Sequence, residues 1–129
     1  MQGVDNKMAE IACALLGLHG AIKINHWQTR SFAHHKATDE LLETLSSLTD
    51  KFMEALQGAQ GRRLDFGFAT CTIPLYNVSD QDAIELIKTL RESLLVNFPR
   101  LIALTPGLTN IRDEMVTALD TTLYLLTFQ

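Results

Sequence analysis

Two pairs of metal-ligand side chains stand out in the sequence. His35 and Asp39 are four residues apart, and so are Asp50 and Glu54. On a helix this spacing places both members of a pair on one face within a turn. Imidazole and carboxylate groups without a thiolate suit iron, with zinc or manganese as alternatives. Each pair could therefore supply ligands to a metal ion.

The two pairs cannot serve one ion within a single chain. They lie fifteen residues apart on one predicted helix, which is roughly 22 Å along the axis at about 1.5 Å per residue. A two-fold axis near Ser46 and Ser47 would bring Asp50 and Glu54 of the partner subunit beside the first pair. We therefore expect self-association through this helix, with two equivalent sites in each dimer.

A third ligand comes from the preceding helix. His26 lies near its end, just before the short turn that leads into the second helix, and can reach the first pair. Leu42 and Met53 lie among the polar residues of the second helix, and we expect them to pack across the dimer interface. The predicted site contains His26, His35 and Asp39 from one subunit with Asp50 and Glu54 from the other.

Four amphipathic segments must position these residues. Apolar residues recur at steps of three and four in each segment. Gly58 and Gly61 are expected to end the second helix, and Pro99 the third. Ser79 followed by Asp82 is typical of a capped helix start. The predicted helices cover about residues 4–28, 33–57, 79–98 and 108–129.

The lengths of the connections favour one architecture. The first two helices and the last two are joined by short turns, whereas about twenty residues, 59–78, join the second helix to the third. An up-down-up-down bundle would not need so long a connection. We predict an all-α protein, a ferritin-like four-helix bundle with one long crossover between helices two and three. It forms a single domain over residues 1–129.

Composition narrows the class of protein. The chain has 129 residues, 47% of them apolar, and a formal charge of −4, which excludes a disordered or collagen-like chain and argues against a DNA-coating role. No run approaches the roughly 18 apolar residues of a membrane span, so we expect no membrane contact. Cys13 and Cys71 are interpreted as reduced thiols of a cytoplasmic protein.

The segment from His26 to Leu41, with Asp50 and Glu54, resembles the signature of the Dps miniferritins. In that family a His-Trp pair ends one helix, matching His26 and Trp27. A Phe then precedes His-x-x-x-Asp on the next helix, and Asp-x-x-x-Glu follows on the same helix. The resemblance covers about residues 15–58. The chain is also similar to short ferritin-like proteins of phage, large viruses and environmental sequences.

The resemblance implies an activity. In the family these residues form a ferroxidase centre shared across a two-fold interface, where peroxide or oxygen oxidises Fe(II), and twelve subunits form a shell that stores the iron. His26, His35 and Asp39 would hold Fe(II), and Glu54 of the partner subunit would complete the site. No extended basic tail precedes the first helix, so we do not carry over the family's DNA binding. No Glu-x-x-His occurs in the sequence, which excludes the di-iron site that ferritins build within one subunit.

Plainer interpretations remain open. His26 alone could hydrogen bond a free carbonyl at a helix end, and the carboxylates alone could be solvated charges. The alternative function is a ferritin-like structural subunit of a particle or filament without redox activity. His19 and His34 are interpreted as structural or exposed residues.

Overall fold

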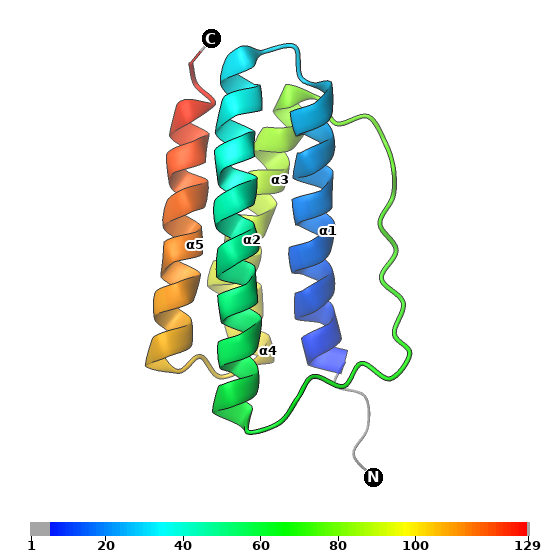
Figure 1. The fold of residues 1–129 in the computed structure, drawn as a ribbon, viewed down its shortest axis with the longest axis vertical. Coiled ribbons are helices and arrows are strands. Elements are labelled where there is room, and N and C mark those ends of the chain that lie inside the picture. Colours follow the sequence, from blue (N-terminus) through cyan, green and yellow to red (C-terminus); the bar gives the residue numbers. More distant parts are fainter. Residues whose placement is uncertain (1–5, 129) are drawn as a thin grey trace.

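The computed structural model describes residues 6–128, in which the only regular secondary structure is helical and no strand occurs (Figure 1). The long helices pack side by side as a four-helix bundle, in which a π-helical turn and a short helix extend the third member. The elements are α1 (Asn6–Gln28), α2 (Phe32–Gln60), α3 (Asp80–Glu92), η1 (Ser93–Asn97), α4 (Phe98–Leu101) and α5 (Pro106–Leu125).

Local sequence signals fix the helix ends. Ser31 caps α2 by accepting a hydrogen bond from the backbone N–H of His34. Gly61 ends the same helix in the left-handed conformation, with φ of 69°, which glycine adopts without steric cost. Ser79 is the N-cap predicted from the sequence, and it forms a reciprocal capping box with Asp82.

The prediction that Pro99 ends the third helix is wrong. After α3 the backbone widens into the π-helical turn η1 and then continues as α4, with Pro99 in its first turn. Pro99 has no N–H to donate to the carbonyl of Leu94, five residues before it. Nη1 of Arg112 in α5 donates to that oxygen instead, over 3.3 Å. The helix therefore passes the proline because a neighbouring helix replaces the missing donor.

The core lies along the inner faces of the four long helices. These faces carry apolar residues at helical spacing, so each helix buries one stripe against its neighbours. A second, smaller cluster joins the end of α1 to the start of α3. The side chains with essentially no exposure are Met8, Ile11, Ile22, Leu45, Phe52, Leu56, Ile87, Leu90, Leu94, Phe98, Leu108 and Met115.

Residues 61–79 contain no helix and lie along α1 (Figure 1). Cys71 is joined to Cys13 by a disulfide, and further on the side chain of Gln28 binds Asn77 and accepts from the backbone N–H of Val78. The connection thus runs from the first half of α1 to its carboxyl end. As a result α3 begins beside the end of α1, and α2 and α3 run in the same direction.

The disulfide overturns the interpretation of both cysteines as free thiols. The sulfur atoms of Cys13 and Cys71 are bonded, and no free cysteine remains. The two residues are 58 positions apart, and only the path of the connection along α1 brings them together. The spacing of the two cysteines in the sequence does not predict that residues 61–79 lie along α1.

Helix α1 is more apolar than the search for an unbroken apolar run indicates. By length and composition, α1 (Asn6–Gln28) is long and apolar enough to cross a membrane. The same composition is found in the core helix of a bundle, and α1 contributes Met8, Ile11, Leu15 and Ile22 to the core.

Candidate metal site

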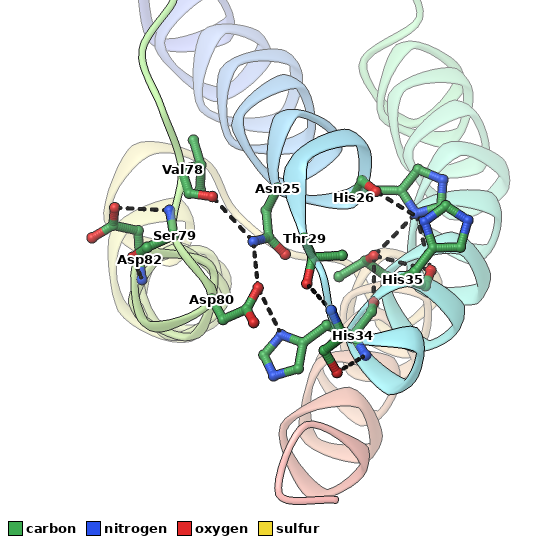
Figure 2. Close-up of polar contacts among 11 residues, drawn as sticks. Asn25, His26, Thr29, His34, His35, Val78, Ser79, Asp80 and Asp82 are labelled. Atoms are coloured by element: carbon green, nitrogen blue, oxygen red, sulfur yellow. Dashed lines mark hydrogen bonds and ion pairs between the residues drawn. The ribbon is translucent and has the colours of Figure 1, made fainter. Parts of the chain in front are cut away.

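His26 and His35 face each other at the corner between α1 and α2 (Figure 2). Their rings are stacked, with centroids 4.1 Å apart and an interplanar angle of 16°. Each ring also makes a hydrogen bond to the other residue's backbone. The Nδ1 atom of His26 lies 3.0 Å from the carbonyl oxygen of His35, and Nδ1 of His35 lies 3.0 Å from the carbonyl oxygen of His26.

These hydrogen bonds define which ring nitrogen can bind a metal. A carbonyl oxygen only accepts, so Nδ1 carries the proton in both rings and Nε2 keeps its lone pair when the ring is neutral. The hydroxyl of Thr38 donates to the carbonyl of His34 over 2.7 Å and can accept from His26, whose Nδ1 is 3.1 Å away. Metal-binding histidines are commonly oriented through such Nδ1–H to carbonyl bonds.

Asp39 lies next to this histidine pair. Its Oδ1 atom is 3.9 Å from Nε2 of His26, and its side chain is 63% exposed whereas that of His26 is 14% exposed. This separation is too long for a hydrogen bond. It suits two ligands of one ion, because ligand atoms at about 2.1 Å from a metal are separated by up to about 4.2 Å.

The other two predicted ligands lie elsewhere on α2. Asp50 and Glu54 are exposed, and Asp50 is eleven residues beyond Asp39, or roughly 16 Å along the axis. Within residues 6–128, no three His, Cys, Asp or Glu side chains form a group that could hold a metal ion. The structure thus brings His26 close to His35 and Asp39, but it leaves the second carboxylate pair apart.

The expected role of Leu42 is wrong. Its side chain is only 6% exposed and belongs to the core of its own chain. The imidazole of His19 in α1, half-buried, lies 3.3 Å from the carbonyl oxygen of Leu42 through Nε2. The small exposed part of Leu42 lines a groove between α1 and α2, so Leu42 packs mainly within its own chain. Met53 is half-buried against the same core.

A groove between α1 and α2 connects the two parts of the predicted site. Asp39 lies on its lining, as does Asp50, and the small side chains of Ser46 and Ser47 lie between them. Lys23 and His19 of α1 line the opposite wall. The groove therefore carries charges of both signs, with two small side chains in its middle.

Sequence reasoning missed a second polar cluster around His34, which is buried and therefore fits the structural one of the two interpretations left open. Nδ1 of His34 lies 3.5 Å from Oδ1 of Asp80 at the start of α3, and Nδ2 of Asn25 donates to the same oxygen over 3.0 Å (Figure 2). Burial alone would raise the pKa of Asp80. Hydrogen bonds from Asn25 and Thr29 and the charge of His34 outweigh burial and hold this pKa below its usual value.

One local signal for this cluster was present in the sequence. Asp80 is the first residue after the Ser79 cap, where a carboxylate is favoured by the helix dipole. Nothing in the sequence places that residue beside Asn25, because fifty-five residues separate the two and only the long connection brings them together.

Comparison with known proteins gives a family without an assigned function. Residues 26–126 match the family of unknown function DUF5856, and the chain belongs to that family. It is also 32% identical, over 85 residues, to an uncharacterised 14.6 kDa protein from the mobD-ri intergenic region of Enterobacteria phage T4. The matched stretch covers 66% of this chain and 62% of the phage protein. No solved structure matches the chain.

Proposed function

We propose that this protein is a ferritin-like bundle that takes up Fe(II) as its substrate and oxidises it at a site shared by two copies of the chain. One observation carries the proposal: the Nδ1–H groups of His26 and His35 are both held by backbone carbonyls, which leaves Nε2 of both rings as free ligand atoms. The long connection between α2 and α3, with these helices in the same direction, suits a ferritin-like bundle with one crossover.

A second copy of the chain would complete the site. If its α2 lay antiparallel in the groove, with the two-fold axis about two residues before Ser46 and Ser47, Asp50 and Glu54 of the partner subunit would lie level with Asp39 and His35. The dimer would then hold two equivalent sites made of nitrogen and oxygen ligands, which suit Fe(II). The family that the sequence resembles forms a shell of twelve subunits. Such a dodecamer, located in the cytoplasm, would retain the Fe(III) product in its cavity.

The reaction would be an oxidation. Two Fe(II) ions each lose one electron, and hydrogen peroxide takes up both electrons and two protons to give two water molecules. The protein residues hold and orient the ions, with the partly buried His26 on the inner side of the site and the exposed Asp39 on the outer side. The benefit to the cell would be iron storage and removal of peroxide under oxidative stress.

Complementation between two inactive variants tests the shared site. His35→Ala removes a ligand on one side of the interface, and Asp50→Asn combined with Glu54→Gln removes the ligands on the other side. Each variant alone should lose the acceleration of Fe(II) oxidation by peroxide, measured at the ultraviolet ferric band after anaerobic loading. Co-expressed, the two should recover about a quarter of the wild-type sites, since half of randomly formed dimers would contain one intact site of two.

The matched control is Glu40→Gln, which removes another exposed carboxylate from α2 and should leave the oxidation rate unchanged. Recovery of no activity on co-expression, or full activity of the Asp50→Asn/Glu54→Gln variant, would contradict a shared site.

A structural subunit is the second candidate. One observation favours it: within residues 6–128 of a single chain, no three His, Cys, Asp or Glu side chains form a group that could hold a metal ion. A particle or filament seen by light scattering, formed by protein that does not accelerate Fe(II) oxidation, would select this function over the first.

A further inference from the structure

Two buried side-chain atoms in residues 6–128 have no hydrogen-bond partner, and both belong to one cluster. They are Oδ1 of Asn25 and Nδ1 of His34. Asn25 is fully buried, and the side chain of His34 is 9% exposed. An unpaired buried polar atom costs free energy, so two such atoms on residues that both contact Asp80 indicate a partner that the chain does not itself provide.

The atoms around Asp80 are rich in lone pairs. Figure 2 shows Asn25, Thr29 and His34 gathered around the carboxylate from the end of α1, the turn after it and the start of α2. Nδ2 of Asn25 is fully used, because it donates to both Val78 and Asp80. Its Oδ1 atom and the carboxylate can only accept, and Nδ1 of a neutral His34 accepts as well. Such a set of acceptors favours a cation.

We propose that a divalent transition-metal ion binds between His34, Asp80 and Asn25. The separation of 3.5 Å between Nδ1 of His34 and Oδ1 of Asp80 fits two ligands of one tetrahedral ion, which are about 3.4 Å apart at bond lengths of about 2.1 Å. A nitrogen and two oxygen donors without a thiolate suit Zn²⁺, Mn²⁺ or Fe²⁺. The amide oxygen of Asn25 is the third ligand, and water completes the shell.

The site can be reached from solvent. A surface hollow is lined by His34 and Asp80 together with Ser31, Phe32 and the chain segment 126–128 that follows α5. Asp80 keeps 42% of its side chain exposed, so an ion can enter from this side while His34 and Asn25 hold its inner face.

This site is separate from the one proposed for Fe(II) oxidation. Asn25 directly precedes His26, and His34 directly precedes His35. Neighbouring residues of a helix point in directions about 100° apart, so the two sets of side chains face different sides of the α1–α2 corner. The two sites share no ligand, and this second site requires no partner subunit.

Zinc binding by metal-stripped protein tests the inference. The parent is the His35→Ala/Asp39→Asn variant, which lacks the first site. Equilibrium dialysis against zinc alone should leave about one ion on each chain, and zinc should raise the melting temperature. Adding Asp80→Asn, or His34→Gln if the former fails to fold, should abolish both effects. Adding Glu85→Gln, which removes an exposed carboxylate from the same helix, should preserve them.

The outcomes separate the two sites. A parent variant that binds no zinc, or that binds it equally after both Asp80→Asn and His34→Gln, would overturn the inference and leave a buried water as the missing partner. Wild-type protein that binds no more zinc than the parent variant would instead count against the shared site, while the site at Asp80 stands.

Discussion

The backbone carbonyls of the α1–α2 corner select the chemistry of its two histidines. Each carbonyl accepts from Nδ1 of the opposite ring, so the corner sets both the tautomer and the direction in which Nε2 points. Stacking of the rings at 4.1 Å restrains their rotation. Ligands held in this way lose little freedom when a metal binds.

The tautomers can be observed directly. Long-range proton–nitrogen NMR spectra of the neutral rings should show His26 and His35 protonated at Nδ1 and bare at Nε2. Zinc should then shift the Nε2 resonances of these two residues. Rings protonated at Nε2 would contradict the orientation on which the proposed function rests.

Asp80 should make folding stability depend on acid pH. Its lowered pKa in the folded protein means that its contribution is present above the unfolded-state value of about 4 and is lost as pH falls through the folded-state value. In metal-free protein, Asp80→Asn should therefore be less stable than wild type near neutral pH. Urea unfolding should show this gap narrowing at acid pH, whereas a gap of constant size would exclude the effect.

At the scale of residues, the sequence predicted ligands by type and spacing. It correctly placed His26 beside His35 and Asp39, because a short turn between two helices leaves little freedom. It could not place His34, since the contact with Asp80 depends on a distant helix start. It also misplaced Leu42, because the position of α1 on α2 decides which residues of α2 are exposed.

The connection between α2 and α3 is held to α1 at two places. The disulfide fixes its middle, and Gln28 and Asn25 fix its end beside the candidate sites. Cys71 is exposed, so reductants can reach the bond. Reduction of the disulfide should release Cys71 and the neighbouring part of the connection from α1, while the contacts of Gln28 and Asn25 still hold its end.

Removal of the disulfide should lower stability substantially. Closing a loop of 58 residues is worth about 4 kcal/mol at 25 °C through the entropy of the unfolded chain. The Cys13→Ser/Cys71→Ser variant should thus unfold at lower denaturant concentration than oxidised wild type. Reductant should destabilise wild type to the same degree and leave the variant unchanged. Thiol titration finding two free cysteines in unreduced protein would contradict the bond.

The hydrogen bond from Arg112 to the carbonyl of Leu94 stabilises the helix where Pro99 lacks an N–H. Arg112→Met leaves the carbonyl of Leu94 without its donor, which should cost about 1–2 kcal/mol. In a Pro99→Ala background the new N–H can donate to that carbonyl, so the same substitution should cost less. Chemical unfolding of the double-mutant cycle measures the difference. Asp113→Asn, which removes only the ion pair at the surface, is the control, and equal costs in both backgrounds would exclude this role.

Elements were predicted well where the signal is local. The capping box at Ser79, the glycine at the end of α2 and the apolar periodicity all act within a few residues. The failures depend on partners distant in sequence: Arg112 replaces the hydrogen bond that Pro99 cannot make, and α1 holds the connection through Cys71. Local patterns carry no information on either partner.

At the scale of the molecule, the proposed Fe(II) site is incomplete on one chain, and the proposal requires a second copy to complete it. At the α1–α2 corner His26 lies against His35 and 3.9 Å from Asp39, whereas Asp50 and Glu54 are exposed further along α2. Burying these carboxylates against histidines of a second copy would pair charges that otherwise face solvent. The groove with Ser46 and Ser47 is the surface that the proposal assigns to such a copy.

A cysteine on the expected two-fold axis tests this assembly. Residues near such an axis lie close to their own copies, so Ser46→Cys should form a covalent dimer under mild oxidation, seen on non-reducing gels, without loss of the Cys13–Cys71 bond. Thr117→Cys, which introduces an exposed thiol on α5 instead, should remain monomeric on the same gel. The linked dimer should also oxidise Fe(II) at the wild-type rate, because the bond would join the copies in the orientation that the shared site requires. Cross-linking through Thr117→Cys but not through Ser46→Cys would place the interface on α5 and exclude the shared site.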